Sequence, residues 1–189
     1  MDSTIHQEFI EHINTSQKTM ESIVQNLEIA AKTCIESLKN DGKILILGNG
    51  GSAADAQHIA AELVSRYKTE RQGLAAIALT TDTSILTAIS NDYGYEKVFS
   101  RQIEALAKPG DVVIAISTSG NSKNVINALR KAKQQQCMTI GLSGRDGGEF
   151  NDLCNVNLVV PSDDTPRIQE MHIFIGHTIC HLIDQEFTN

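Results

Sequence analysis

Apolar residues along this chain follow two alternating patterns, long stretches with helical spacing and short continuous runs. Helical spacing begins near residue 4 and continues to about residue 40, with a break left open near residues 14–16. Five short runs rich in isoleucine, leucine and valine then predict buried strands, at residues 43–47, 74–79, 112–116, 138–142 and 158–160. The intervening segments predict helices at residues 53–67, 84–89, 96–107, 123–135, 149–153 and 167–186. This alternation predicts an α/β fold, a doubly wound αβα sandwich around a five-stranded parallel sheet.

No linker, repeat or low-complexity segment divides the 189 residues, so the sequence predicts one domain. Residues 1–40 are expected to form N-terminal helices and residues 41–189 the α/β core. A helical extension of this length before the first strand is expected to pack partly against other subunits. Covering the protein's own sheet is the other interpretation of this extension.

A glycine-rich turn, Gly48-Asn49-Gly50-Gly51-Ser52, ends the first predicted strand. Its glycines allow positive φ angles and close approach of a ligand to the backbone, and Ser52 is expected to cap the next helix. Such a turn directs unpaired N–H groups and the positive end of a helix at one point, where a phosphate can bind. The turn matches neither the dinucleotide fingerprint nor the P-loop, and an ordinary strand-to-helix turn is an equally good interpretation.

The third predicted strand ends in a second polar turn, Ser117-Thr118-Ser119-Gly120-Asn121-Ser122. Its four hydroxyl side chains favour phosphate binding, through hydroxyl and backbone N–H groups, over a helix cap with surplus serines. Both turns fall at the carboxyl ends of predicted parallel strands, which is the edge at which ligands collect in this fold.

Histidines and acidic residues gather on two predicted helices. His58 and Glu62 are four residues apart and therefore share one face of the helix after the glycine turn. The last helix carries a second polar group, Gln169, His172, His177 and His181. Gln169 and His177 are separated on one straight helix by roughly 12 Å of rise and about 80° of rotation. Either Gln169 lies in an irregular first turn, or the two residues serve one site from different subunits.

Composition and charge narrow the range of functions. A net charge of −7 and a pI near 5.3 argue against non-specific binding to nucleic acid. No apolar run is long enough to predict a membrane-spanning helix, and the polar N-terminal residues predict no signal peptide. The scattered cysteines predict free thiols in a reducing cytoplasm and argue against a zinc-thiolate site; they are Cys34, Cys137, Cys154 and Cys180.

Several segments together resemble the phosphoheptose isomerase family of sugar-isomerase (SIS) domain proteins, which have a flavodoxin-like fold. They are GNGGSAADAQHIAAEL, AIALTTDTS, ISNDYGYEKVFSRQIEAL, ISTSGNSKNV and RIQEMHIFIGHTICHLID. The resemblance implies conversion of the ketose sedoheptulose 7-phosphate to the aldose D-glycero-D-manno-heptose 7-phosphate, the first step towards the heptose of lipopolysaccharide or capsule. It also implies a cytoplasmic homotetramer with active sites between subunits.

The same resemblance implies roles for individual residues. The phosphate would bind Ser117, Thr118, Ser119 and Ser122. Further substrate contacts would come from Asn49, Gly50, Gly51, Ser52, Glu62, Asn91, Asp92 and Gln169. Glu62 and His177 would be the catalytic pair. One zinc ion per subunit would be held by His58, Glu62, Gln169 and His177.

Ketose-to-aldose conversion explains why a carboxylate and an imidazole are needed. A base must remove a proton from C1 to give an enediol, and an acid must move protons between the two oxygens; we assign Glu62 as base and His177 as acid. A divalent metal ion polarises the carbonyl, and nitrogen and oxygen donors suit zinc. A carboxylate bound to zinc is a poorer base, so the sequence leaves open whether the ion is catalytic or orienting.

Two other functions compete with the isomerase hypothesis. Some SIS-domain proteins have lost catalysis and bind a protein partner such as the replication initiator. Those binders resemble this chain but lack the equivalents of Glu62 and His177, which are present here. A sugar-phosphate sensing domain is the third hypothesis, although such domains are usually fused to a helix-turn-helix or to a second SIS copy.

Overall fold

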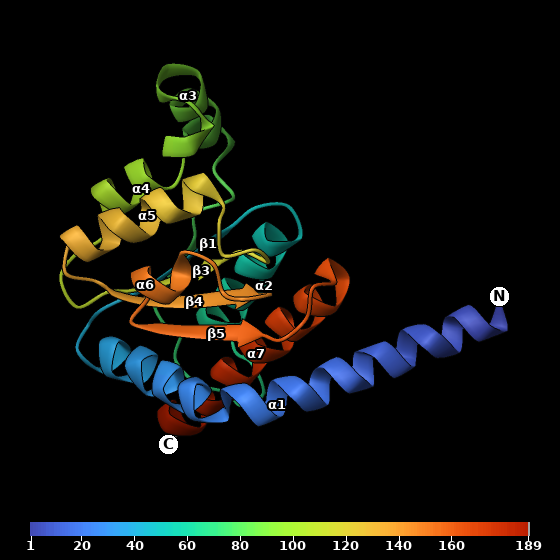
Figure 1. Cartoon of the computed structure of the whole chain (residues 1–189). Coiled ribbons are helices and arrows are strands. Elements are labelled where there is room, and N and C mark those ends of the chain that lie inside the picture. The colour runs from blue at the N-terminus through green and yellow to red at the C-terminus, as the bar shows by residue number, and fades with distance from the viewer. Residues whose placement is uncertain (189) are drawn as a thin grey trace.

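The computed structural model describes residues 1–188 and is built around one five-stranded parallel sheet (Figure 1). Its strands are β1 (Ile44–Gly48), β2 (Ala76–Ala78), β3 (Val112–Ile116), β4 (Met138–Gly144) and β5 (Val156–Val160). Every neighbouring pair is parallel, and the strands lie in the order β2-β1-β3-β4-β5. The predicted fold class is therefore confirmed. The order reverses between β1 and β3, which makes their carboxyl ends the switch point where ligands bind in this fold.

Helices cover both faces of the sheet. On one face lie α1 (Asp2–Lys39), α2 (Gly51–Val64) and α7 (Thr165–Phe187); on the other lie α4 (Ser100–Leu106), α5 (Lys123–Gln134) and α6 (Phe150–Leu153) (Figure 1). Side chains alternate along each strand, so Ile44 and Ile46 of β1 join the first core cluster, whereas Leu45 and Leu47 join the second. This two-sided burial explains why the strand sequences are continuous apolar runs.

The N-terminal segment is one helix of 38 residues, so the break left open near residues 14–16 does not occur. Its second half packs against the core through Ile23, Ala30 and Cys34, and α1 contacts both α7 and β5. Its first half extends beyond the rest of the molecule (Figure 1). Large apolar side chains there are at least half exposed: Ile5, Phe9, Ile10 and Ile13.

The start of α2 differs from its prediction. The helix begins at Gly51, its N-cap is Gly50 with a φ of 58°, and Ser52 is buried inside the first turn. Ser52 is therefore not the N-cap. The physical reason is that Gly50 can take up a positive φ, which turns the chain two residues earlier than a serine cap would.

The segment after β2 also differs from its prediction. Helix α3 (Thr83–Tyr93) is longer than expected, because the Asp82 side chain accepts the Ile85 N–H at 2.9 Å and Gly94, with a φ of 85°, ends the helix. The predicted turn at residues 90–95 is thus mostly helical. The helix predicted at 96–107 is divided into the 3₁₀ helix η1 (Tyr95–Lys97) and α4.

Residues 1–188 include no helix that is long and apolar enough to span a membrane. All four cysteines are free, as expected, and only Cys154 is partly exposed.

Candidate active site

The two predicted anion-binding turns lie side by side at the switch point. The glycine turn follows β1, the hydroxyl-rich turn follows β3, and these strands are direct neighbours. Two side-chain amides join the turns: Asn49 Nδ2 donates to Asn124 Oδ1 at 2.9 Å, and Asn124 Nδ2 donates to Asn49 Oδ1 at 2.8 Å. The Tyr95 hydroxyl also donates to Asn49 Oδ1, at 3.1 Å. Asn124 is buried, so this amide pair fixes how the two turns face each other.

The hydroxyl-rich turn leaves the start of α5 available to an anion. Ser122 is the N-cap residue of α5, but its side chain caps no N–H group of the helix. Its hydroxyl lies 3.0 Å from the Ser117 hydroxyl instead. Ser119 Oγ accepts the Asn121 N–H at 3.2 Å, and Thr118 and Ser119 are half-buried. Hydroxyl groups and helix N–H groups therefore converge at one point, which is an arrangement that binds phosphate.

A second polar cluster lies between α2 and α7. His58 Nε2 and His177 Nε2 are 2.8 Å apart, and His58 Nε2 lies 3.3 Å from Glu62 Oε1. One donor atom from each of the three residues lies within 4.8 Å of the others. The Tyr67 ring stacks on His177, with ring centroids 5.4 Å apart and planes at 29°. The structure thus joins one carboxylate and two imidazoles.

Close packing of the two helices makes this cluster possible. At Gly176, next to His177 in α7, a Cβ atom would lie only 2.5 Å from Cδ1 of Ile59 in α2. A larger residue at this crossing would therefore force the Ile59 side chain or the two helices to shift. Ile59 and Gly176 are the sequence neighbours of His58 and His177, so this close contact lies beside the two imidazoles.

The protonation state of His177 favours metal binding. Burial is the largest effect that lowers the pKa of His177; the nearby His58 and Lys68 lower it further, and Glu62 opposes them. A neutral imidazole keeps a lone pair for a metal ion. Two imidazole nitrogens and one carboxylate oxygen suit zinc, and three protein ligands with an open fourth position are typical of catalytic zinc sites. His58, Glu62 and His177 are thus placed to hold a metal ion.

Gln169 does not lie beside its presumed fellow ligand His177. It is in the second turn of α7, a regular helix from Thr165 onward, and its side chain lies against the glycine turn. A Cβ atom at Gly51 would be 2.7 Å from Gln169 Nε2. The irregular first turn considered above is therefore absent.

Other residues with expected substrate contacts lie in two places. Gly50, Gly51 and the buried Ser52 are at the glycine turn, close to the hydroxyl-rich turn. Asn91 and Asp92 are exposed on α3, which projects from the body of the molecule (Figure 1). Among residues 1–188, no hydrogen bond or ion pair joins α3 to His58, Glu62 or His177.

Sequence reasoning missed several residues that shape the site. Tyr67 and Asn124 are ordinary residues in the sequence pattern, and only their tertiary contacts distinguish them. Asp55, one turn before His58, is another. Burial raises the pKa of Asp55, with the nearby His58 opposing this, and its Oδ2 is buried with no hydrogen-bond partner among residues 1–188. The sequence did contain a signal for Asp55, since a residue three positions before His58 lies on the same face of the helix.

Comparison with known proteins identifies the family. The family model described as SIS domain matches residues 8–144, which include His58 and Glu62 but end before α7. The whole chain is 64% identical to the phosphoheptose isomerase of Aliarcobacter butzleri strain RM4018, with 100% of both proteins covered. The chain belongs to the phosphoheptose isomerase family. It is also 58% identical, over 98% of its length and 94% of the relative, to the phosphoheptose isomerase of Helicobacter hepaticus.

Solved structures of the phosphoheptose isomerase family have the same fold. A phosphoheptose isomerase from Neisseria gonorrhoeae is 48% identical and superposes with a TM-score of 0.92, over 97% of this chain and 98% of that one. One from Francisella tularensis is 36% identical, with a TM-score of 0.93 and 97% coverage of both chains. Each match covers 97% of this chain and so extends into α7, which lies beyond the last residue matched by the SIS family model, residue 144.

Proposed function

We propose that this chain is a sugar-phosphate isomerase that converts sedoheptulose 7-phosphate to D-glycero-D-manno-heptose 7-phosphate. The observation that carries the proposal is the cluster of Glu62 with His58 and His177, in a chain that matches phosphoheptose isomerases over its full length. The product would be the heptose precursor of lipopolysaccharide or capsule, made in the cytoplasm.

The catalytic pair is Glu62 and His177. The Glu62 side chain is 21% exposed, so a substrate can reach its carboxylate, which removes the C1 proton of the ketose. His177 donates a proton to one substrate oxygen and accepts one from the other, a role open to an imidazole that is neutral near pH 7. Return of the proton to C2 completes the aldose.

Zinc is the proposed metal, with one ion per subunit. His58, Glu62 and His177 would hold it, and Gln169 would join them from a different subunit, because in its own chain Gln169 lies beside Gly51. When bound, the ion would polarise the carbonyl and stabilise the enediolate.

The substrate would lie across the switch point. Its phosphate binds the hydroxyls of Ser117, Thr118, Ser119 and Ser122 together with the free N–H groups of α5. Its sugar contacts the glycine turn, from Asn49 to Ser52, and the α3 residues Asn91 and Asp92. Because the Asn49 side chain is engaged by Asn124, its contact with the substrate uses the backbone.

The assembly is proposed to be a homotetramer with active sites between subunits. Two features of the chain support this. The first half of α1 exposes a row of large apolar side chains where the helix extends beyond the rest of the molecule, and such a surface is typical of a contact with another chain. Gln169 and His177 are also too far apart along α7 to serve one site from one chain. A non-catalytic partner-binding role is disfavoured, because the carboxylate and both imidazoles are retained.

The test follows the sugar by NMR in deuterated water, with purified, metal-analysed protein and sedoheptulose 7-phosphate. Wild-type protein should form the aldose, and Glu62→Gln and His177→Gln should each lose most of this turnover. His181→Gln is the matched control, one turn further along α7, and should stay close to wild type. Intact oligomers that give no turnover, with or without zinc, would refute the proposal and favour a partner-binding role.

A further inference from the structure

The loop between α2 and β2 lies against the carboxyl-terminal ends of α2 and α7, the two helices that carry the catalytic cluster. Within it, the Arg71 side chain is only 1% exposed and has every nitrogen occupied. Arg71 NH2 donates to the Glu62 carbonyl and NH1 to the Leu63 carbonyl, both at 2.9 Å. These carbonyls belong to the last turn of α2, where the carbonyl groups have no hydrogen-bond donor within the helix. A buried cation therefore caps the helix end that carries the proposed catalytic base.

Asp184 of α7 holds the same loop from the other side. Its Oδ1 accepts Arg71 Nε at 2.6 Å, and its Oδ2 accepts the backbone N–H groups of Lys68 and Thr69 at 2.7 and 3.0 Å. Its side chain is 1% exposed. Burial by itself would raise the pKa of Asp184, but the N–H groups of Lys68, Thr69 and Arg71 together outweigh burial and lower it. The carboxylate is thus ionised and fully engaged.

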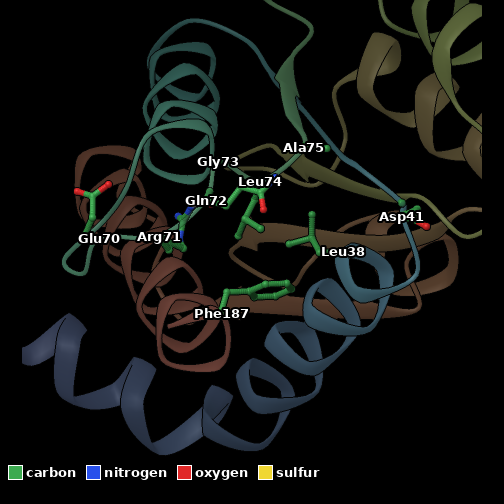
Figure 2. A pocket seen from close by; sticks show the side chains of 10 residues that line it. Leu38, Asp41, Glu70, Arg71, Gln72, Gly73, Leu74, Ala75 and Phe187 are labelled. Atoms are coloured by element: carbon green, nitrogen blue, oxygen red, sulfur yellow. Dashed lines mark hydrogen bonds between the residues drawn. The ribbon is translucent and has the colours of Figure 1, made fainter. Parts of the chain in front are cut away.

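The position of Asp184 on α7 relates this contact to the catalytic cluster. Asp184 follows His177 by seven residues, so the two side chains share one face of the helix about 10 Å apart along its axis. Figure 2 shows Arg71 beside the ribbon of α7, while its neighbour Glu70 points away from the body. Arg71 also forms part of the wall of a pocket of about 570 Å³ at the amino ends of β1 and β2, opposite the switch point.

We propose that Arg71 and Asp184 are positioning residues for isomerisation: their buried ion pair joins the end of α2 to α7 and so fixes Glu62 relative to His177. This inference rests on the isomerase function proposed above. Neither residue is hydrogen-bonded to a side chain of the cluster: Arg71 reaches Glu62 only at its main-chain carbonyl, and Asp184 contacts the loop. Displacing a catalytic group by about 1 Å can cost roughly 100-fold in rate, so a small shift of either helix should be visible in turnover.

The competing explanation is that the pair contributes only to stability, and the chain offers a matched control. Asp111 is also a buried carboxylate, with a side chain 3% exposed, that accepts two backbone N–H groups and one cation. Its partners are the Lys43 N–H at 3.0 Å, Lys43 Nζ at 2.5 Å and the Lys108 N–H at 2.7 Å. None of them lies on α2 or α7. Asp111→Asn should therefore lose similar stability without moving the cluster.

The experiment compares Asp184→Asn, Arg71→Lys and Asp111→Asn for kcat, KM, thermal unfolding and zinc affinity, the last measured by competition with a chromophoric chelator. We expect Asp184→Asn to lower kcat at least 10-fold and weaken zinc binding, with KM changed less than kcat. Arg71→Lys keeps the positive charge but loses the forked guanidinium that binds both carbonyls, so its kcat and zinc affinity should lie between those of wild type and Asp184→Asn. If Asp184→Asn does not fold, Arg71→Lys serves as the test of the positioning role. Asp111→Asn should stay within twofold of wild-type kcat.

The inference would be overturned if kcat fell equally in Asp184→Asn and Asp111→Asn. It would also be overturned if Asp184→Asn and Arg71→Lys both kept the wild-type kcat and zinc affinity. Failure of the isomerase proposal itself looks different, because the wild-type protein would then show no turnover. The zinc titration still separates the variants in that case: equal zinc affinity in wild type, Asp184→Asn and Arg71→Lys would refute the positioning role.

Discussion

His58 Nε2 and His177 Nε2 lie 2.8 Å apart, although 119 positions separate the two residues in the chain. Neither nitrogen is presented by a loop, since His58 is in α2 and His177 is in α7. The separation between the two imidazoles therefore depends on how two rigid helices pack. The metal-binding hypothesis depends on this distance, and the catalytic hypothesis depends on the same helix packing because Glu62 is also in α2.

Replacing His58 by glutamine should weaken zinc binding by more than about 100-fold, because loss of even an outer partner of a metal ligand typically costs 10–100-fold. Isothermal titration of metal-free protein measures this affinity. His181→Gln is the control, because His181 Nδ1 lies 3.0 Å from Lys68 Nζ and is not part of the cluster. This variant should bind zinc as tightly as wild type does. Equal zinc affinity in both variants would contradict the assignment of the metal site.

Replacing Gly176 by alanine should push α7 away from α2, since the new methyl group would lie 2.5 Å from Ile59 Cδ1. We expect zinc affinity and kcat to fall about 10-fold together, and stability to fall by about 1–3 kcal/mol, which is typical of overpacking. The new methyl group would also lie 2.7 Å from Ile59 Cγ1, and Ile59→Ala removes both atoms, so the double variant Gly176→Ala/Ile59→Ala should recover much of the zinc affinity and kcat, although not the stability. A double variant no better than Gly176→Ala would show that helix separation is not the cause.

Replacing Asn124 by leucine should disturb substrate binding more than chemistry. The change leaves the Asn49 amide without its buried partner and releases the glycine turn from the hydroxyl-rich turn. We expect KM to rise about 10-fold with kcat changed less than about twofold, the pattern of lost uniform binding. Asn127→Ala is the control in the same helix, because Asn127 donates instead to the Glu96 carbonyl. A fall in kcat alone would argue against this role of the amide pair.

Stability should decrease below pH 6.5 because of His172. Burial, only partly opposed by the hydrogen bond with the Ser143 carbonyl, lowers its pKa from 6.5 to about 4. The unfolded chain therefore binds more protons between pH 6.5 and 4, so stability present above pH 6.5 is lost as the pH falls through this window. At pH 4.5 the loss should be about 2–3 kcal/mol relative to pH 7.

Urea unfolding at pH 7 and pH 4.5 measures this effect, with His172→Gln as the comparison. Glutamine cannot gain a proton in this range, so the difference in stability between the two pH values should be smaller in the variant by the same amount. Identical pH dependence in wild type and variant would exclude His172 as the cause.

Much of the fold follows from short-range sequence patterns. The strand at 112–116 was predicted with its observed ends, and every other strand was found within a few residues. These runs are apolar at every position because both faces are buried, which makes them easy to recognise. The segment from 83 to 106 was less predictable: its helix limits depend on the Asp82 cap and on Gly94, and their effects compete with the periodicity around them.

The sequence by itself determined the strands, the two polar turns at their carboxyl ends and the residue types from which a metal and acid-base site can be built. These features depend on neighbours within a few positions, where periodicity and turn chemistry act. Only the tertiary structure decided that His177 meets His58 while Gln169 lies by Gly51, that Asn124 joins the two turns, and that Arg71 meets Asp184. The physical reason is that such distances are set by the packing of α2 against α7 and of loops across the sheet, which no local pattern encodes.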